Sequence, residues 1–150
     1  MILAQRVCQL ANPLVRGLDF LAPLADLGLR LWVGIVFLKS GLAKIQSMES
    51  TIMLFENEYQ VPLLSPEIAA WLGTFAELVF PVLLIAGLGG RFAALVLFVF
   101  NIVAVISYPT LNPAGVEQHV IWGLMLLVTL LHGPGKLSAD HFIGRFCRRH

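Results

Sequence analysis

Four long apolar runs constrain the possible folds of this chain more than any other feature. They extend from about Leu24 to Ile45, Ile68 to Leu88, Arg91 to Tyr108 and Gln118 to His132. A bilayer core about 30 Å thick requires about 20 helical residues to cross it. No run alternates apolar and polar residues, so the runs favour helices over barrel strands. The sequence therefore predicts an all-α, integral membrane four-helix bundle.

The composition points to lipid as the surrounding medium. Of the 150 residues, 58% are hydrophobic and 13% are charged, whereas soluble domains have about 45–50% apolar and about 25% charged residues. A soluble fold of this size leaves much of its chain exposed and has no place for such an excess. We therefore expect the lipid bilayer as a partner. The net charge of +1 gives no reason to expect a nucleic acid.

Basic residues occur in alternate connections between the runs. They lie before the first run (Arg6, Arg16), at the start of the third (Arg91) and after the fourth (Lys136 to Arg149), while residues 46–66 and 109–117 contain no Lys or Arg. Because short flanks rich in Lys and Arg remain in the cytoplasm, both termini are predicted to be cytoplasmic. We expect an N-terminal segment (1–23), a membrane domain (24–142) and a basic cytoplasmic tail (143–150).

The N-terminal segment has two interpretations. Pro13 and Pro23 flank a stretch that contains Leu14, Leu18 and Leu21, which predicts a short amphipathic helix lying at the membrane interface. The alternative is a partly ordered tail. Cys8 and Cys147 form no CxxC or metal-type spacing, so we expect two free thiols and no metal site.

Charged residues within the spans require an explanation, because each costs roughly 2.5–3.5 kcal/mol on insertion scales. One face of the first helix carries a stripe of cations, glycines and an aromatic residue: Arg30, Gly34, Phe37, Gly41 and Lys44. The glycines suit close helix packing. Arg30 and Lys44 lie near the helix ends, where they can serve as interfacial anchors. Lys39 faces the opposite side and sits deeper.

Glu77 lies near the midpoint of the second helix, where its carboxyl group must be either paired with a cation or protonated. Arg30 and Lys39 are the expected partners. Asn101 on the third helix completes a predicted polar seam of Glu77, Arg30, Lys39 and Asn101, although an interhelical hydrogen bond is the more frequent role of such an amide. Two functions remain open for Glu77: a structural ion pair that fixes helix register, or proton handling and ligand binding.

His119 and Lys44 are candidate ligand-binding or proton-handling residues. His119 lies at the outer end of the fourth helix, where a histidine can bind a quinone headgroup, move protons or ligate a metal. A local hydrogen bond at the interface is the simpler alternative. The sequence contains no P-loop, dinucleotide-binding GxGxxG, HExxH or nucleophile elbow. We therefore assign no catalytic residue.

Several motifs occur in an order that resembles the DoxX family. The first helix has Leu29-Arg30-Leu31 followed by Gly34, Phe37, Gly41 and Lys44-Ile45, and Glu77 is followed by Leu83-Leu84-Ile85-Ala86-Gly87-Leu88 and Arg91-Phe92-Ala93-Ala94. The stretch Gly133-Pro134-Gly135-Lys136-Leu137-Ser138-Ala139-Asp140 is similar to the family's terminal GPG-x-x-S-x-D. The resemblance covers about residues 24–142.

The resemblance implies a four-helix inner-membrane protein of bacteria. The family's frequently shared positions fall here at Arg30, Gly34, Gly41, Lys44, Glu77, Arg91, Gly133, Gly135, Ser138 and Asp140. The family is named for a subunit linked to thiosulfate:quinone oxidation, and relatives are described as partners in thiol-redox complexes. Other relatives accompany operons for small modified metal-binding peptides. This chain has no cysteine pair within the membrane, which argues against direct dithiol exchange.

Two functional hypotheses follow. In the first, the protein is a membrane subunit or partner of a quinone- or thiol-linked redox system and holds either a quinone, the one cofactor considered, or a partner oxidoreductase. It would be at most a non-catalytic or partner-dependent subunit of a membrane oxidoreductase, because none of its residues carries electrons by itself. In the second, it is a non-enzymatic accessory or scaffold for a small-peptide or metal-handling pathway. Both hypotheses imply a protein partner or a homo-oligomer.

Overall fold

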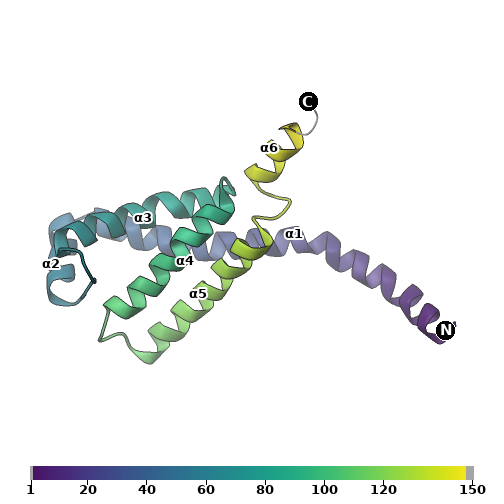
Figure 1. Ribbon diagram of the computed structural model, residues 1–150, viewed down its shortest axis with the longest axis horizontal. Coiled ribbons are helices and arrows are strands. Elements are labelled where there is room, and N and C mark those ends of the chain that lie inside the picture. The colour runs from purple at the N-terminus through teal and green to yellow at the C-terminus, as the bar shows by residue number, and fades with distance from the viewer. Residues whose placement is uncertain (1, 148–150) are drawn as a thin grey trace.

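The computed structural model describes the backbone of residues 2–147 and the side chains of residues 12, 13 and 15–147. Within these residues the chain is helical and has no strand (Figure 1). The helices are α1 (Ile2–Ile45), α2 (Met48–Asn57), α3 (Pro66–Ala86), α4 (Gly90–Ser107), α5 (Pro113–His132) and α6 (Ala139–Cys147). In the described part of the chain, α1, α3, α4 and α5 are long and apolar enough to cross a membrane. The predicted all-α membrane fold is confirmed.

Helix α1 is much longer than the span predicted from Leu24. It has 44 residues and contains Pro13 and Pro23 within it, so at 1.5 Å per residue it is about 66 Å long, roughly twice the thickness of a bilayer core. Its N-terminal half projects beyond the other helices in Figure 1. The segment before Pro23 is therefore a helix. Its position at the membrane interface stays a prediction.

The ends of α3 and α5 are set by local capping. Ser65 and Asn112 are the N-cap residues, and their side chains accept hydrogen bonds from the backbone N–H groups of Ile68 and Gly115. Each cap is followed by a proline at the start of the helix. Because proline has no N–H and its φ is already helical, it favours this position. This explains why α5 begins at Pro113, earlier than the predicted Gln118.

The connection between the first two spans contains a helix, α2, that was not predicted. Ser47 caps it by accepting a hydrogen bond from the backbone N–H of Ser50. Its buried residues are Thr51 and Phe55, and Phe55 packs with Ala69 and Ala70 of α3 in a small apolar cluster. Helix α2 therefore covers the first half of α3.

The register of α1 on α3 is set by glycines. At Gly41 a Cβ atom would lie 2.9 Å from the carbonyl carbon of Glu77, and at Gly34 it would lie 2.6 Å from Cγ1 of Ile85. The two helices are antiparallel, with Arg30 beside Leu84 and Lys44 beside Glu77. Helix α1 thus ends opposite the middle of α3, and α2 occupies the space alongside the rest of it.

The main apolar core lies between the four long helices. It contains Val33 and Phe37 of α1, Leu84 of α3, and residues of α4 and α5 that include Leu97 and Leu126. Figure 1 shows α3 and α4 diverging from the turn that joins them toward the end occupied by α2. The candidate site lies at that wider end.

Candidate functional site

A cavity of about 420 Å³ lies between helices α1 to α5 and the segment that follows α2. Its walls are largely apolar and include Phe37, Phe55, Phe100 and Trp122. The rings of Phe37 and Phe100 meet edge to face at 6.2 Å, and those of Phe37 and Trp122 at 6.0 Å. Such volumes and linings are typical of small-molecule sites, which combine an apolar enclosure with a few placed polar groups.

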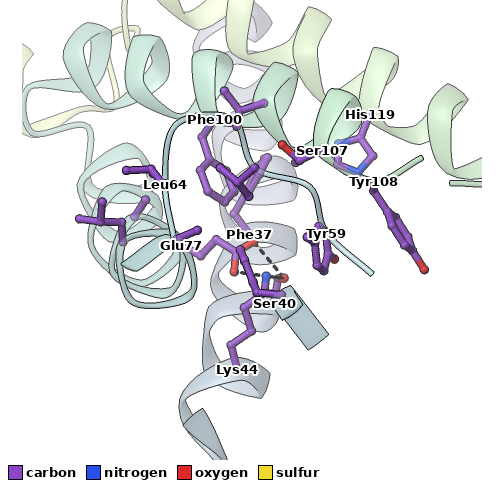
Figure 2. Close-up of a pocket in the computed structure, with 18 of the residues that line it drawn as sticks. Phe37, Ser40, Lys44, Tyr59, Leu64, Glu77, Phe100, Ser107, Tyr108 and His119 are labelled. Atoms are coloured by element: carbon purple, nitrogen blue, oxygen red, sulfur yellow. Dashed lines mark hydrogen bonds and ion pairs between the residues drawn. The ribbon is translucent and has the colours of Figure 1, made fainter. Parts of the chain in front are cut away.

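One side of the cavity carries an ion pair. Lys44 Nζ lies 2.5 Å from Glu77 Oε2, and it also donates a hydrogen bond to Ser40 Oγ at 3.0 Å. The Ser40 hydroxyl donates to Glu77 Oε1 at 3.1 Å. Both carboxylate oxygens of Glu77 therefore have partners, and the side chains of Glu77 and Lys44 are 5% and 15% exposed. Figure 2 shows these three side chains together beneath Phe37.

The predicted partners of Glu77, Arg30 and Lys39, are wrong. Arg30 lies at the opposite end of the bundle, where it is buried and donates to the carbonyl oxygens of Leu84, Ile85 and Leu137. Lys39 is exposed on the outer face of α1. The faces of α1 were predicted correctly, because Arg30 and Lys44 share one face and Lys39 lies on the other. The register of α1 on α3, however, places Lys44, which was expected to be an interfacial anchor, beside Glu77. The residues of the predicted seam therefore do not form one continuous polar group.

Asn101 and His119 are paired across α4 and α5. The Asn101 Nδ2 group donates to the backbone oxygen of His119 at 2.9 Å, and Asn101 Oδ1 lies 2.8 Å from His119 Nδ1. Because a carbonyl oxygen only accepts, this contact fixes the amide orientation, so Nδ1 must donate to Oδ1. In a neutral ring His119 Nε2 is then a hydrogen-bond acceptor. Asn101 thus makes the interhelical bond, and the ring it orients lines the cavity.

Two tyrosines, Tyr59 and Tyr108, line the cavity, and the sequence alone did not identify either of them. Tyr59 stacks between Phe55 and Tyr108, with ring centroids 4.7 Å and 4.9 Å apart. The Tyr108 hydroxyl donates to Glu58 Oε2 at 3.0 Å. Tyr59 lies outside the four spans, and burial raises the pKa of its hydroxyl, with smaller contributions from Tyr108 and nearby carboxylates. The sequence offered only one sign of this aromatic wall, namely that a tyrosine follows α2 and another follows α4.

Ser40 and Ser107 were also missed. Both line the cavity. Ser40 is four residues before Lys44 in sequence, a spacing that places both side chains on one face of a helix. That spacing was a usable signal for Ser40. Nothing in the sequence distinguished Ser107 from other small polar residues near helix ends.

Most of the remaining motif residues gather at the other end of the bundle, in a group that we call the terminal clasp (Arg30, Gly87, Ser138 and Asp140). Asp140 accepts hydrogen bonds from the backbone N–H groups of Gly89 and Gly90, each at 2.8 Å, and so caps α4. Gly87 has φ of 68°, and a Cβ atom there would lie 2.5 Å from Cβ of Ser138. The clasp joins the α3–α4 turn to the segment after α5.

The flanking motif residues support this turn. Arg91 donates to the backbone oxygen of His132 at 3.4 Å. Gly133 and Gly135 have positive φ values of 92° and 77°, which favour glycine. Ser138 donates to the oxygen of Gly135 at 2.6 Å. These contacts are architectural, and none of these residues lines the cavity beside Glu77.

Among the described side chains, no three His, Cys, Asp or Glu residues gather where they could hold a metal ion. Cys147 is an exposed free thiol. The side chains of Arg6 and Cys8, and residues Arg148 and Arg149 of the predicted basic tail, lie outside the described residues.

The fold and the cavity define a helical multi-pass membrane protein with a largely apolar pocket that holds an ion pair inside its bundle. The DoxX family model matches residues 25–109, more than half of the chain, and the chain belongs to the DoxX family. The match includes Arg30, Lys44 and Glu77 but ends before the Gly133–Asp140 motif. No curated protein and no solved structure matches the chain.

Proposed function

We propose that this protein is a bacterial inner-membrane subunit or partner of a quinone-linked redox system, and that the cavity holds the quinone headgroup. The observation that carries the proposal is an apolar, aromatic cavity with hydrogen-bonding groups on two of its sides. Lys44, Glu77 and Ser40 lie on one side, and His119 lies on another (Figure 2). A flat ring with polar substituents on opposite edges matches this distribution.

The size and walls of the cavity fit such a headgroup. A volume of about 420 Å³ accommodates a substituted six-membered ring. Phe100 and Trp122 offer edge and face contacts for a planar π-system. Leu72 both lines the cavity and is 53% exposed on a helix long and apolar enough to span a membrane, so we expect this wall to reach the lipid in which quinones dissolve.

A bound quinone would supply two-electron, two-proton chemistry within the membrane. The residues of this chain would bind and orient it. His119 Nε2 would accept a hydrogen bond, and the Glu77 carboxylate, held by Lys44 and Ser40, would keep a proton-accepting group beside the ring. Electrons would come from a partner protein. We assign the chain itself no catalytic residue.

The basic flanks favour an orientation with both termini in the cytoplasm. In that orientation α2 and the cavity lie toward the outer face of the membrane, while the terminal clasp lies at the cytoplasmic side. A partner that delivers electrons to the cavity would then act from the outer side or from within the bilayer.

The proposal is tested by quinone binding to protein purified into lipid nanodiscs. Trp122 lines the cavity, whereas Trp32 and Trp71 are 63% and 50% exposed. In a Trp32→Phe/Trp71→Phe background, decylubiquinone should quench the fluorescence of Trp122 saturably, with one site per chain. Absence of saturable quenching would overturn the proposal.

A pair of alanine variants supplies the matched control. Ala76 lines the cavity, and Ala86 lies exposed on the same helix. Ala76→Leu should remove most of the binding by filling the cavity, whereas Ala86→Leu should bind decylubiquinone as the parent does. Equal binding by both variants would place the quinone elsewhere on the protein.

A further inference from the structure

The hydroxyl of Ser107 is buried and has no hydrogen-bond partner among the described residues. The residue is 1% exposed. Its backbone oxygen is engaged, because it accepts a hydrogen bond from the N–H of Gln60 at 2.7 Å. An unsatisfied buried hydroxyl is destabilising, and native proteins contain few of them.

Comparable hydroxyls in the bundle are satisfied locally. Thr74 donates to the backbone oxygen of Ala70 at 2.8 Å, and Thr129 donates to that of Met125 at 3.2 Å. This bond to the carbonyl four residues earlier is the usual solution for a hydroxyl inside a helix. Ser107, the last residue of α4, does not make it. Its hydroxyl is therefore left without the partner that the fold provides elsewhere.

Ser107 lines the cavity, on the side opposite the ion pair. Figure 2 shows it beside His119, across the cavity from Ser40 and Glu77. Two other polar groups of the cavity already have protein partners: Glu77 is held by Lys44 and Ser40, and His119 Nδ1 is held by Asn101. Ser107 supplies a donor that no protein group uses.

We propose that Ser107 is a ligand-binding residue whose hydroxyl donates a hydrogen bond to an oxygen of the molecule held in the cavity. Together with the ion pair on the opposite side, it selects a flat, membrane-dissolved ligand that carries oxygen atoms on opposite edges. This inference rests on the proposed function and identifies the group that distinguishes a quinone from a hydrocarbon of the same shape.

Two probes of one shape test this role in nanodiscs. 2-Methyl-1,4-naphthoquinone carries the two oxygens, and 2-methylnaphthalene has the same ring system without them. Ser107→Ala should raise the Kd of the naphthoquinone about five- to tenfold, the effect of one lost hydrogen bond. It should leave the Kd of the hydrocarbon unchanged. The melting temperature of the ligand-free variant should not fall, because no intramolecular bond is lost.

Thr129→Val is the matched control. Thr129 is also a buried hydroxyl, but it is bonded within its helix and does not line the cavity. This variant should bind both probes as the wild type does. Its melting temperature reports the cost of removing a satisfied hydroxyl.

The outcomes separate the two proposals. If the wild type binds decylubiquinone and Ser107→Ala binds the naphthoquinone equally well, the role of Ser107 is wrong and the proposed function stands. If Ser107→Ala raises the Kd of the naphthoquinone and of the hydrocarbon equally, Ser107 is a packing residue, and the inference is also overturned. If the wild type binds neither quinone, the proposed function fails and the inference fails with it.

Discussion

Lys44 Nζ lies 2.5 Å from Glu77 Oε2, and this contact joins the end of α1 to the middle of α3. Gly41, one turn before Lys44, lies against the backbone of Glu77. The close approach at Gly41 brings the cation within reach of the carboxylate. The ion pair and the glycine thus depend on the same helix register, and the polar side of the cavity follows from it.

Removing one member of the pair should destabilise the bundle. Lys44→Met leaves the carboxylate of Glu77 buried without its cation, at a cost of about 3–5 kcal/mol. Lys44→Met combined with Glu77→Gln should recover part of this loss, because no unpaired charge remains. Thermal unfolding in detergent measures both effects.

Lys39→Met provides the control, because Lys39 is on the same helix but exposed. Its melting temperature should stay close to that of the wild type. A double variant no more stable than Lys44→Met would show that the pair is not the source of the loss. If Glu77→Gln lowers the melting temperature but leaves quinone binding intact, the role of the ion pair is structural.

Gly41→Ala should force α1 away from α3. The added Cβ atom would lie 2.9 Å from the carbonyl carbon of Glu77, which belongs to the backbone and cannot rotate away. Overpacking of this kind costs about 1–3 kcal/mol. Gly28→Ala on the same helix meets nothing within 4 Å and should be neutral or stabilising. Equal melting temperatures for the two variants would contradict the packing described for α1 and α3.

Asp140→Ala should loosen the terminal clasp. The variant loses both hydrogen bonds to the start of α4, at a cost of about 1–2 kcal/mol. Asp140→Asn keeps one acceptor and should lose less, whereas Asp19→Ala at an exposed position should have little effect. Quinone binding should persist in all three variants, since Asp140 does not line the cavity beside Glu77.

The buried Tyr59 hydroxyl should reduce stability at high pH. Its pKa is raised above the ordinary value of 10.0 by burial, so the unfolded chain releases this proton first. The contribution of Tyr59 to stability is complete below the ordinary pKa and is lost as the pH rises toward the folded value. Lysines titrate in the same range, so the difference between wild type and Tyr59→Phe is the quantity to measure. If the melting temperatures of the wild type and Tyr59→Phe change in parallel from pH 8 to pH 11, Tyr59 does not have this role.

The proposed orientation can be tested with the native thiols. Cys147 is exposed, and Cys8 is predicted to share its side of the membrane. A membrane-impermeant maleimide should label neither thiol in intact cells and should label Cys147 after permeabilisation. Labelling of Cys147 in intact cells would show that the orientation is the reverse of the one proposed.

The sequence predicts the spans and the faces of α1 well, because both depend on local properties. Hydropathy and length locate the long helices, and a 100° rotation per residue separates Arg30 and Lys44 from Lys39. The partner of Glu77 depends instead on how far α1 is shifted along α3. That shift is set by contacts at Gly34 and Gly41 with residues far away in sequence, so a pattern within one helix does not reveal it.

The cavity itself was beyond prediction for a related reason. Its walls come from five helices and the connections between them, and its polar groups include Ser40 and Ser107, whose importance depends on what they face. Helix α2 was missed because its ten residues are too short to span a membrane. The Ser47 cap was the one local sign of it.

The bond between Asp140 and the start of α4 has a consequence for biosynthesis. Gly89 and Gly90 are translated about fifty residues before the carboxylate that caps them. The turn between α3 and α4 is therefore complete in the nascent chain before its cap has been synthesised. Because Asp140 follows all four spans in the sequence, this end of the bundle is closed only after every span has been synthesised.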